Sequence, residues 1–263
     1  MTQIPFAPIS LSSAALAATL ALPLSLAATQ IEAQSQTTGG WQFTITPYLW
    51  ASGQEGRVGA FENAPDTDID LSFSDLLENL EFAAMVVGNA RNGRWGITAD
   101  VFYFAAATDG DIAADAFSGY EYDSTLTFVT VVGEYAVVDQ PDTTLWLGAG
   151  ARYWGVTNDL TLNPGTRPGG SFDGDDHWWD PVISVRGTTD LGARTFFTGA
   201  LFTGGFGAGS ESMVDAFAGV GYAFTPTTAG IAGYRYLAVD RDEGDFLYDV
   251  RLEGLMLGVR FQL

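Results

Sequence analysis

The chain has 263 residues, of which 32 are Gly and 13 % are aromatic, and this composition favours many short strands joined by turns. Only 16 % of the residues are charged, yet the formal net charge is −21, and all eleven basic residues are Arg. Such acidity excludes electrostatic binding to nucleic acid, which needs a basic surface. The absence of Cys excludes a disulfide framework and thiolate chemistry.

The N-terminal region has the features of an export signal. Residues 11–27 form an apolar stretch of small residues, and Ser25-Leu26-Ala27 fits the small-x-small cleavage pattern. We therefore predict a signal peptide over 1–27 and a polar linker over 28–40, although the first ten residues contain no Lys or Arg. The alternative is a membrane anchor, which Pro23 and the small residues disfavour. After residue 40, no apolar run reaches the ~20 residues that a helical span requires.

Residues 41–263 contain no break in composition and are predicted to form one domain of alternating strands. Short connections alternate with longer ones, which is typical of an outer-membrane barrel with turns in the periplasm and loops outside. The predicted fold is all-β, an antiparallel up-and-down transmembrane barrel of ten strands in the cell outer membrane. The predicted strands cover 41–51, 80–91, 94–105, 120–137, 143–157, 178–189, 194–204, 211–224, 228–240 and 246–263.

The first long loop, 52–79, contains a short helical pattern. Ser74 is the predicted N-cap, and Leu76, Leu77 and Leu80 lie on one side of the helix. This helix could enter the barrel mouth as a plug or lie over it as a cap. Alternatively, 57–61 and 69–73 form a further hairpin, which would give twelve strands; eight is the smaller alternative.

The hairpin around "NARNGRW" indicates which face meets lipid. Asn-Gly predicts a type I′ turn, which would set Arg91 opposite Arg94 and Met85 opposite Asp100. One face then carries charges, whereas the other is apolar and runs from Trp95 to Tyr103, our predicted aromatic belt. Eight residues span about 26 Å at ~3.3 Å each, or about 20 Å after a tilt of ~40°, close to the ~25 Å apolar band of such barrels. A soluble barrel would reverse these faces, but the predicted signal peptide and the loop asymmetry disfavour it.

The last strand, "EGLMLGVRFQL", alternates up to its final residue. Leu255, Leu257, Val259, Phe261 and Leu263 share one parity. We expect this strand to pair with the first strand and close the barrel, because an unpaired strand edge is not tolerated in lipid.

Most strands carry one or two charged residues on the predicted inner face. Buried charges are costly unless they are paired, so we predict a charge network that fills the lumen, with an ion-selective constriction as the alternative. Ten strands leave little room for a pore. The predicted network contains Glu81, Arg91, Arg94, Asp100, Glu134, Arg152, Asp180, Arg186, Asp215 and Arg235, and Arg260 adds a further base.

No catalytic motif is present. His177 lies among Asp residues in "SFDGDDHWWD", and some ten-stranded outer-membrane proteases use carboxylates and a His at the mouth, but their local sequence is absent here. A single His without Cys does not make a zinc site. We predict no enzyme activity and no cofactor, and a hydrolase using His177 is the least favoured alternative. Weak binding of divalent ions is predicted for acidic clusters in the loops. The residues concerned are Asp173, Asp175, Asp176, Asp240, Asp242, Glu243 and Asp245.

Several stretches together resemble an uncharacterised family of Gram-negative outer-membrane β-barrel proteins. They are "WQFTITPYLWASGQEG" (41–56), "WWDPVISVR" (178–186), "GGFGAGS" (204–210), "GYRYLAVD" (233–240) and "LGVRFQL" (257–263). The resemblance implies the fold and the location, but no activity. It also implies a barrel-assembly ending with a terminal aromatic residue, from which this chain departs because it ends in Leu263.

The expected function is therefore structural or surface interaction through acidic loops, with a narrow channel for ions or small solutes as the alternative. The expected partners are outer-membrane lipid, lipopolysaccharide and the barrel-assembly machinery. No nucleic acid is expected.

Overall fold

The computed structural model describes residues 40–59, 67–114, 117–244 and 246–263, so the predicted signal peptide and nearly all of the linker lie outside the described residues. The described part of the chain forms eleven strands and one short helix. In chain order they are β1 (Gln42–Gly59), β2 (Thr67–Leu71), α1 (Phe73–Glu78), β3 (Leu80–Asn92), β4 (Trp95–Ala114), β5 (Phe117–Asp139), β6 (Thr143–Pro164), β7 (Gly170–Asp190), β8 (Thr195–Gly205), β9 (Ser212–Ala223), β10 (Thr228–Glu243) and β11 (Phe246–Gln262).

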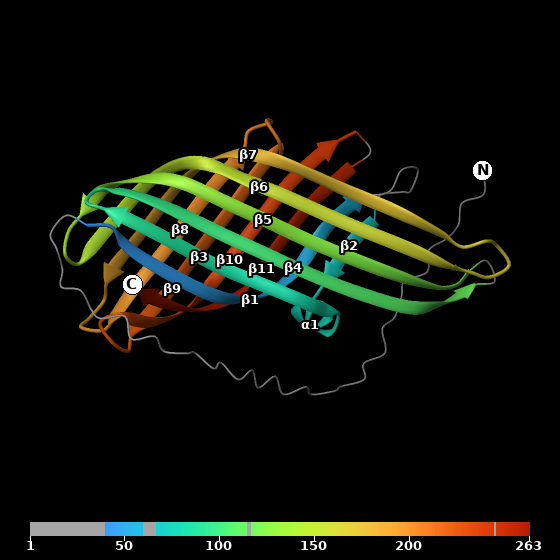
Figure 1. Cartoon of the computed structure of the whole chain (residues 1–263), viewed down its shortest axis with the longest axis horizontal. Helices are drawn as coiled ribbons and strands as arrows, with labels where there is room; N and C mark the ends of the chain where they lie inside the picture. The colour runs from blue at the N-terminus through green and yellow to red at the C-terminus, as the bar shows by residue number, and fades with distance from the viewer. Residues whose placement is uncertain (1–39, 60–66, 115–116, 245) are drawn as a thin grey trace. The chain divides into compact units, whose positions relative to one another are not determined.

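Ten of these described strands close into an antiparallel barrel, as predicted (Figure 1). Neighbours in the chain pair with one another, and β1 pairs with both β3 and β11. The extra strand, β2, pairs with the far part of β1, Gln54–Val58, and takes no part in the closure. We call the end with the short connections the turn end and the opposite end the loop end.

The outer surface of the barrel is apolar. Leu49, Leu255 and Leu257 are 73, 65 and 60 % exposed, and their alternating neighbours point inward and are buried. Trp95 is also exposed and lies 5.0 Å from Tyr135, measured between ring centroids, while Tyr103 lies 5.8 Å from Phe82. An apolar band bordered by aromatic rings is the surface that a transmembrane barrel presents to lipid.

The β3–β4 hairpin differs from its predicted register. Met85 pairs with Phe102 and not with Asp100, because the two-residue loop is Gly93-Arg94 and not Asn92-Gly93. A type I′ turn needs positive φ at both central residues, whereas here only Gly93 has it, at 58°, as in a type II′ turn. The register has shifted by two residues, so the side chains of the regularly paired part of the hairpin keep their predicted faces.

Strands β4 to β7 are longer than predicted. They continue through the expected loops 106–119 and 158–177 and extend far beyond the loop end of their neighbours (Figure 1). We call their outer parts, 107–114, 117–124, 157–164 and 170–176, the extension. Asp and Gly are depleted in strands, so the sequence of these parts indicated loops, but backbone pairing between neighbours holds them as strands.

The helix α1 confirms the predicted helix in the first long loop, but its N-cap is Ser72 and not Ser74. The Ser72 Oγ accepts a hydrogen bond from the Asp75 amide at 3.3 Å, and the Asp75 carboxylate accepts one from the Ser72 amide at 2.8 Å, which is a capping box. The Ser72 hydroxyl, which also donates to the Asp75 carboxylate at 2.6 Å, and then the Ser72 amide lower the pKa of Asp75. No residue of α1 is buried, so this helix is not a plug.

Among the residues that the structure describes, no helix is long and apolar enough to cross a membrane.

Candidate functional site

Four charged side chains meet inside the barrel and form the ionic cluster: Asp100, Arg152, Asp215 and Arg235. They come from β4, β6, β9 and β10, and none is more than 4 % exposed. The Arg235 Nη2 lies 2.6 Å from an oxygen of Asp100 and 2.7 Å from one of Asp215. The Arg152 Nη2 lies 2.6 Å from the same oxygen of Asp215. Two acids and two bases therefore balance in the buried interior, where each charge needs a partner.

Neutral donors and acceptors complete the ionic cluster. The Arg152 Nε donates to the Thr130 hydroxyl at 2.6 Å, and the Arg235 Nη1 donates to the Tyr48 hydroxyl at 2.7 Å. The Tyr48 hydroxyl in turn donates to Asp100 at 2.9 Å. The chain of hydrogen bonds thus runs from β5 and β6 through β9 and β10 to β1 and β4, and so crosses the lumen.

An aromatic layer adjoins the ionic cluster. It consists of Trp50, Phe102, Phe128, Trp154 and Trp178. Successive ring centroids in this order are 5.9, 4.7, 5.3 and 5.8 Å apart. The guanidinium carbon of Arg152 lies 4.6 Å from the centroid of Phe128, and that of Arg235 lies 5.0 Å from that of Trp50. Cation–π contacts in a desolvated site stabilise both partners, so the layer and the cluster form one packed unit.

Asp180 lies in the lumen, but it is not part of the ion-pair network that we predicted. It is fully buried, and neutral donors hold its carboxylate: the Trp154 indole at 2.8 Å, the Ser210 amide at 2.7 Å and the Ser210 hydroxyl at 2.8 Å. Ser210 also accepts from the Trp178 indole at 2.8 Å. These bonds attach the β8–β9 connection to the wall of the barrel.

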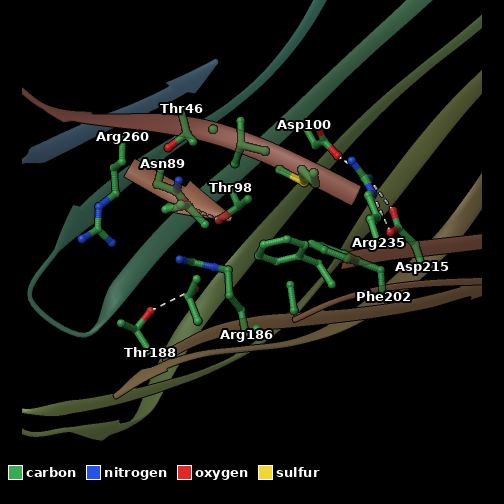
Figure 2. Close-up of a pocket in the computed structure, with 18 residues that line it drawn as sticks. Thr46, Asn89, Thr98, Asp100, Arg186, Thr188, Phe202, Asp215, Arg235 and Arg260 are labelled. Atoms are coloured by element: carbon green, nitrogen blue, oxygen red, sulfur yellow. Dashed lines mark hydrogen bonds and ion pairs between the residues drawn. The ribbon is translucent and has the colours of Figure 1, made fainter. Parts of the chain in front are cut away.

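A second ion pair lies nearer the turn end. The Arg186 guanidinium binds the Glu134 carboxylate through two hydrogen bonds, of 3.2 and 2.6 Å, and the Thr98 hydroxyl donates to Glu134 at 2.7 Å. Between this pair and the ionic cluster lies a cavity of about 130 Å³, whose wall includes Arg186, Arg235 and Arg260 (Figure 2).

Three residues of the predicted network lie outside it. Glu81 is exposed beside an irregularity of the β3–β4 pairing, so it does not reach the lumen. Arg91 lies at the turn end, where it pairs with Asp139 at 2.5 Å. Arg94 belongs to the exposed turn and donates to the Val137 carbonyl at 3.2 Å. Alternation along each strand predicted that these residues share the inner face. Which of the inner-face charges can meet also depends on how far along its strand each residue lies.

The residues predicted to bind divalent ions do not come together. In the described ranges, no three His, Cys, Asp or Glu side chains are grouped so that they could hold a metal ion. Asp176 instead pairs with Arg241 at 3.0 Å, and Glu243 approaches the same guanidinium at 3.5 Å. Partial burial raises the pKa of Asp240, and the negative charges of Asp249, Glu211 and Asp242 raise it further. Asp173, Asp175 and Asp242 lie on the strands β7 and β10, and Asp245 lies outside the described residues.

The outward face of the extension is acidic. Asp123, Asp159 and Asp173 are direct cross-strand partners on β5, β6 and β7. Partial burial and then the Asp173 carboxylate raise the pKa of Asp159. Like charges directly opposite one another destabilise a sheet. Repulsion within the extension therefore raises the free energy of the folded state, and the packing of the barrel has to offset it.

His177 is exposed on β7 and shares the parity of the outward residue Trp179. It does not point into the mouth, where the hydrolase alternative would need it.

Sequence reasoning missed the neutral members of the lumen. Tyr48 and Trp50 share the inward parity of β1, and Trp154 and Trp178 share that of Arg152 and Asp180. The alternation therefore placed these residues on the inner face. Aromatic residues occur on both faces of these strands, however, so their type alone did not single them out.

Comparison with known proteins bears on the fold. No family model matches the chain, and no curated protein matches it. The structure is similar to the outer membrane protease OmpT from Escherichia coli, with a TM-score of 0.55 and 10 % sequence identity, covering 88 % of this chain and 99 % of that one. The chain has the fold of an outer-membrane β-barrel. With its apolar outer band, this is the architecture of an integral protein of the cell outer membrane.

Two other barrels show weaker likeness. The translocator domain of the autotransporter NalP from Neisseria meningitidis has a TM-score of 0.42 and 14 % identity, covering 87 % of this chain and 90 % of that one. Ail of Yersinia pestis has a TM-score of 0.33 and 12 % identity, covering 86 % of this chain and all of that one.

Proposed function

We propose that this protein is a closed, non-conducting and non-enzymatic barrel that serves a structural or surface-interaction role through its acidic extension. The ionic cluster and the aromatic layer carry this proposal. Hydrogen bonds join β6 to β9 and β10 to β4, which are distant around the barrel, and the aromatic rings pack against the arginines that make these bonds. A pore would have to pass through these contacts.

The absence of a pore is the first testable consequence. The full chain, reconstituted in a planar bilayer, is expected to insert and to show no discrete conductance steps, because the lumen is filled by paired charges and rings. Insertion is checked separately by protection of the barrel from protease. Reproducible steps whose ion selectivity changes on substitution of Arg152 would instead support the narrow channel, the alternative function.

The extension is the proposed site of interaction. Its outward face is acidic, so we infer that its partners are cationic groups or cations shared with lipopolysaccharide, and that outer-membrane lipid surrounds the band below it. We also propose that the chain is inserted by the barrel-assembly machinery and that it belongs to the uncharacterised family that its sequence resembles.

Orientation is testable because the chain contains no Cys. Arg167 is exposed at the tip between β6 and β7, and Thr225 is exposed in the connection between β9 and β10 at the turn end. On intact cells, a membrane-impermeant maleimide is expected to label Arg167→Cys, and to label Thr225→Cys only after the outer membrane is permeabilised. The reverse pattern would place the extension in the periplasm and refute a cell-surface role.

A further inference from the structure

The cavity between the Glu134–Arg186 pair and the ionic cluster has two different walls. Figure 2 shows Arg260, Thr46, Asn89, Thr98 and Arg186 toward one end, and Phe202 with three members of the ionic cluster, Asp100, Asp215 and Arg235, toward the other. Apolar side chains, among them Phe217, Ile231 and Met256, complete the lining. A ligand that fits this cavity therefore has a polar end and an apolar body.

Arg260 differs from the other arginines of the lumen. Arg152, Arg186 and Arg235 each bind a carboxylate at 2.7 Å or less. The Arg260 guanidinium has no hydrogen bond or ion pair with any residue in the described ranges. It lies over the ring of Phe196, whose centroid is 4.3 Å from the guanidinium carbon.

An unpaired guanidinium inside a barrel is unfavourable. It carries five N–H donors, and a partly desolvated charge without a partner is costly. The ring of Phe196 satisfies one face of the guanidinium but none of its donors. An anion that accepts hydrogen bonds from Arg260 would remove this cost.

The chemistry of the guanidinium selects the anionic group. Its planar fork matches a carboxylate through two parallel hydrogen bonds, which the Arg186–Glu134 pair already shows in this lumen. The hydroxyls of Thr46 and Thr198 also line the cavity and can donate to the remaining lone pairs, whereas those of Thr98 and Thr188 already donate to Glu134 and Thr198. The cavity volume of about 130 Å³ is close to that of a ~150 Å³ apolar cavity that binds benzene.

The cavity lies toward the turn end, a few residues from the short connections. The side chain of Arg186 faces the lumen, yet it remains 25 % exposed. Arg186 therefore keeps part of its guanidinium accessible within the cavity, although it already binds Glu134.

We propose that this cavity is a binding site for a small organic monocarboxylate, with the carboxylate on Arg260 and Arg186 and an apolar body against Phe202 and Phe217. The site does not depend on the proposed role of the extension, since it lies at the opposite end of the barrel.

Benzoate is a suitable probe, because it combines one carboxylate with a flat apolar body. Isothermal titration of the full chain, refolded in detergent micelles, is expected to show one saturable site for benzoate. The variant Arg260→Gln is expected to weaken binding at least tenfold. The matched control is Arg94→Gln, which removes an exposed arginine of the turn and should leave the affinity unchanged.

Two neutral or inorganic probes keep the test independent of the variants. On the unmodified protein, benzyl alcohol tests whether the negative charge of the ligand is needed, and inorganic phosphate tests whether its apolar body is needed. Both are expected to bind at least tenfold more weakly than benzoate. The proposal is overturned if benzoate shows no saturable binding, if benzyl alcohol or phosphate binds as tightly, or if a folded Arg260→Gln protein binds benzoate with unchanged affinity.

Discussion

Replacement of Arg235 by Met is expected to lower the free energy of unfolding by roughly 3–5 kcal/mol, the usual cost of removing one partner from a buried ion pair. Arg235 is bound to Asp100, Asp215 and Tyr48 at once. Its loss leaves the buried Asp100 carboxylate without a cation. The measurement is urea unfolding in detergent micelles, followed by tryptophan fluorescence, since Trp50 lies directly against Arg235.

Two further variants test whether pairing is the cause. Arg94→Met removes an exposed arginine and should change stability by no more than about 0.5 kcal/mol. The double variant Arg235→Met with Asp100→Asn leaves Arg152 paired with Asp215 and restores neutrality. It should recover part of the loss, with a coupling free energy of about 0.5–3 kcal/mol. A single variant as stable as the unmodified protein would show that the cluster contributes little to the folded state.

Replacement of Gly254 by Ala is expected to prevent closure of the barrel, or to destabilise it by more than about 3 kcal/mol, because an overpacked contact and unpaired backbone groups would add. Gly254 pairs with Ser52 in the β1–β11 seam. A Cβ at this position would lie 1.9 Å from the Ala51 carbonyl oxygen and 2.8 Å from the Ser52 Cα. Both are main-chain atoms, so relief requires the two closing strands to separate.

Gly88 in β3 offers the matched control. A Cβ at Gly88 would meet nothing within 4 Å, so Gly88→Ala should fold normally. Folding is measured as the fraction of protein that migrates as the compact, unboiled form on a denaturing gel after refolding into micelles. If Gly254→Ala reached this form with the yield and rate of the unmodified chain, the tight approach of β1 and β11 would not be needed for closure.

Strand faces were predictable because alternation is a local property. The hairpin around Gly93 shows the limit: its turn type was wrong and the register shifted by two residues, yet both faces were right, because an even shift preserves parity. Strand lengths were not predictable at the loop end. The extension is rich in Asp, and the ladder of backbone hydrogen bonds continued where side-chain propensity indicated loops.

The sequence by itself determined the all-β class, the antiparallel barrel, the lipid-facing band and the parity of the inward charges, because each of these follows from period-two alternation and from turns a few residues long. It favoured ten strands but left eight and twelve open. Only the tertiary structure decided which charges meet. Arg235 binds residues 20, 135 and 187 positions away in the chain, and Arg260 has no such partner among the described residues. Two charges inside a barrel can pair only if they lie at a similar height along the barrel axis and on strands that face one another across the lumen. The alternation of residues along a strand gives neither of these two quantities.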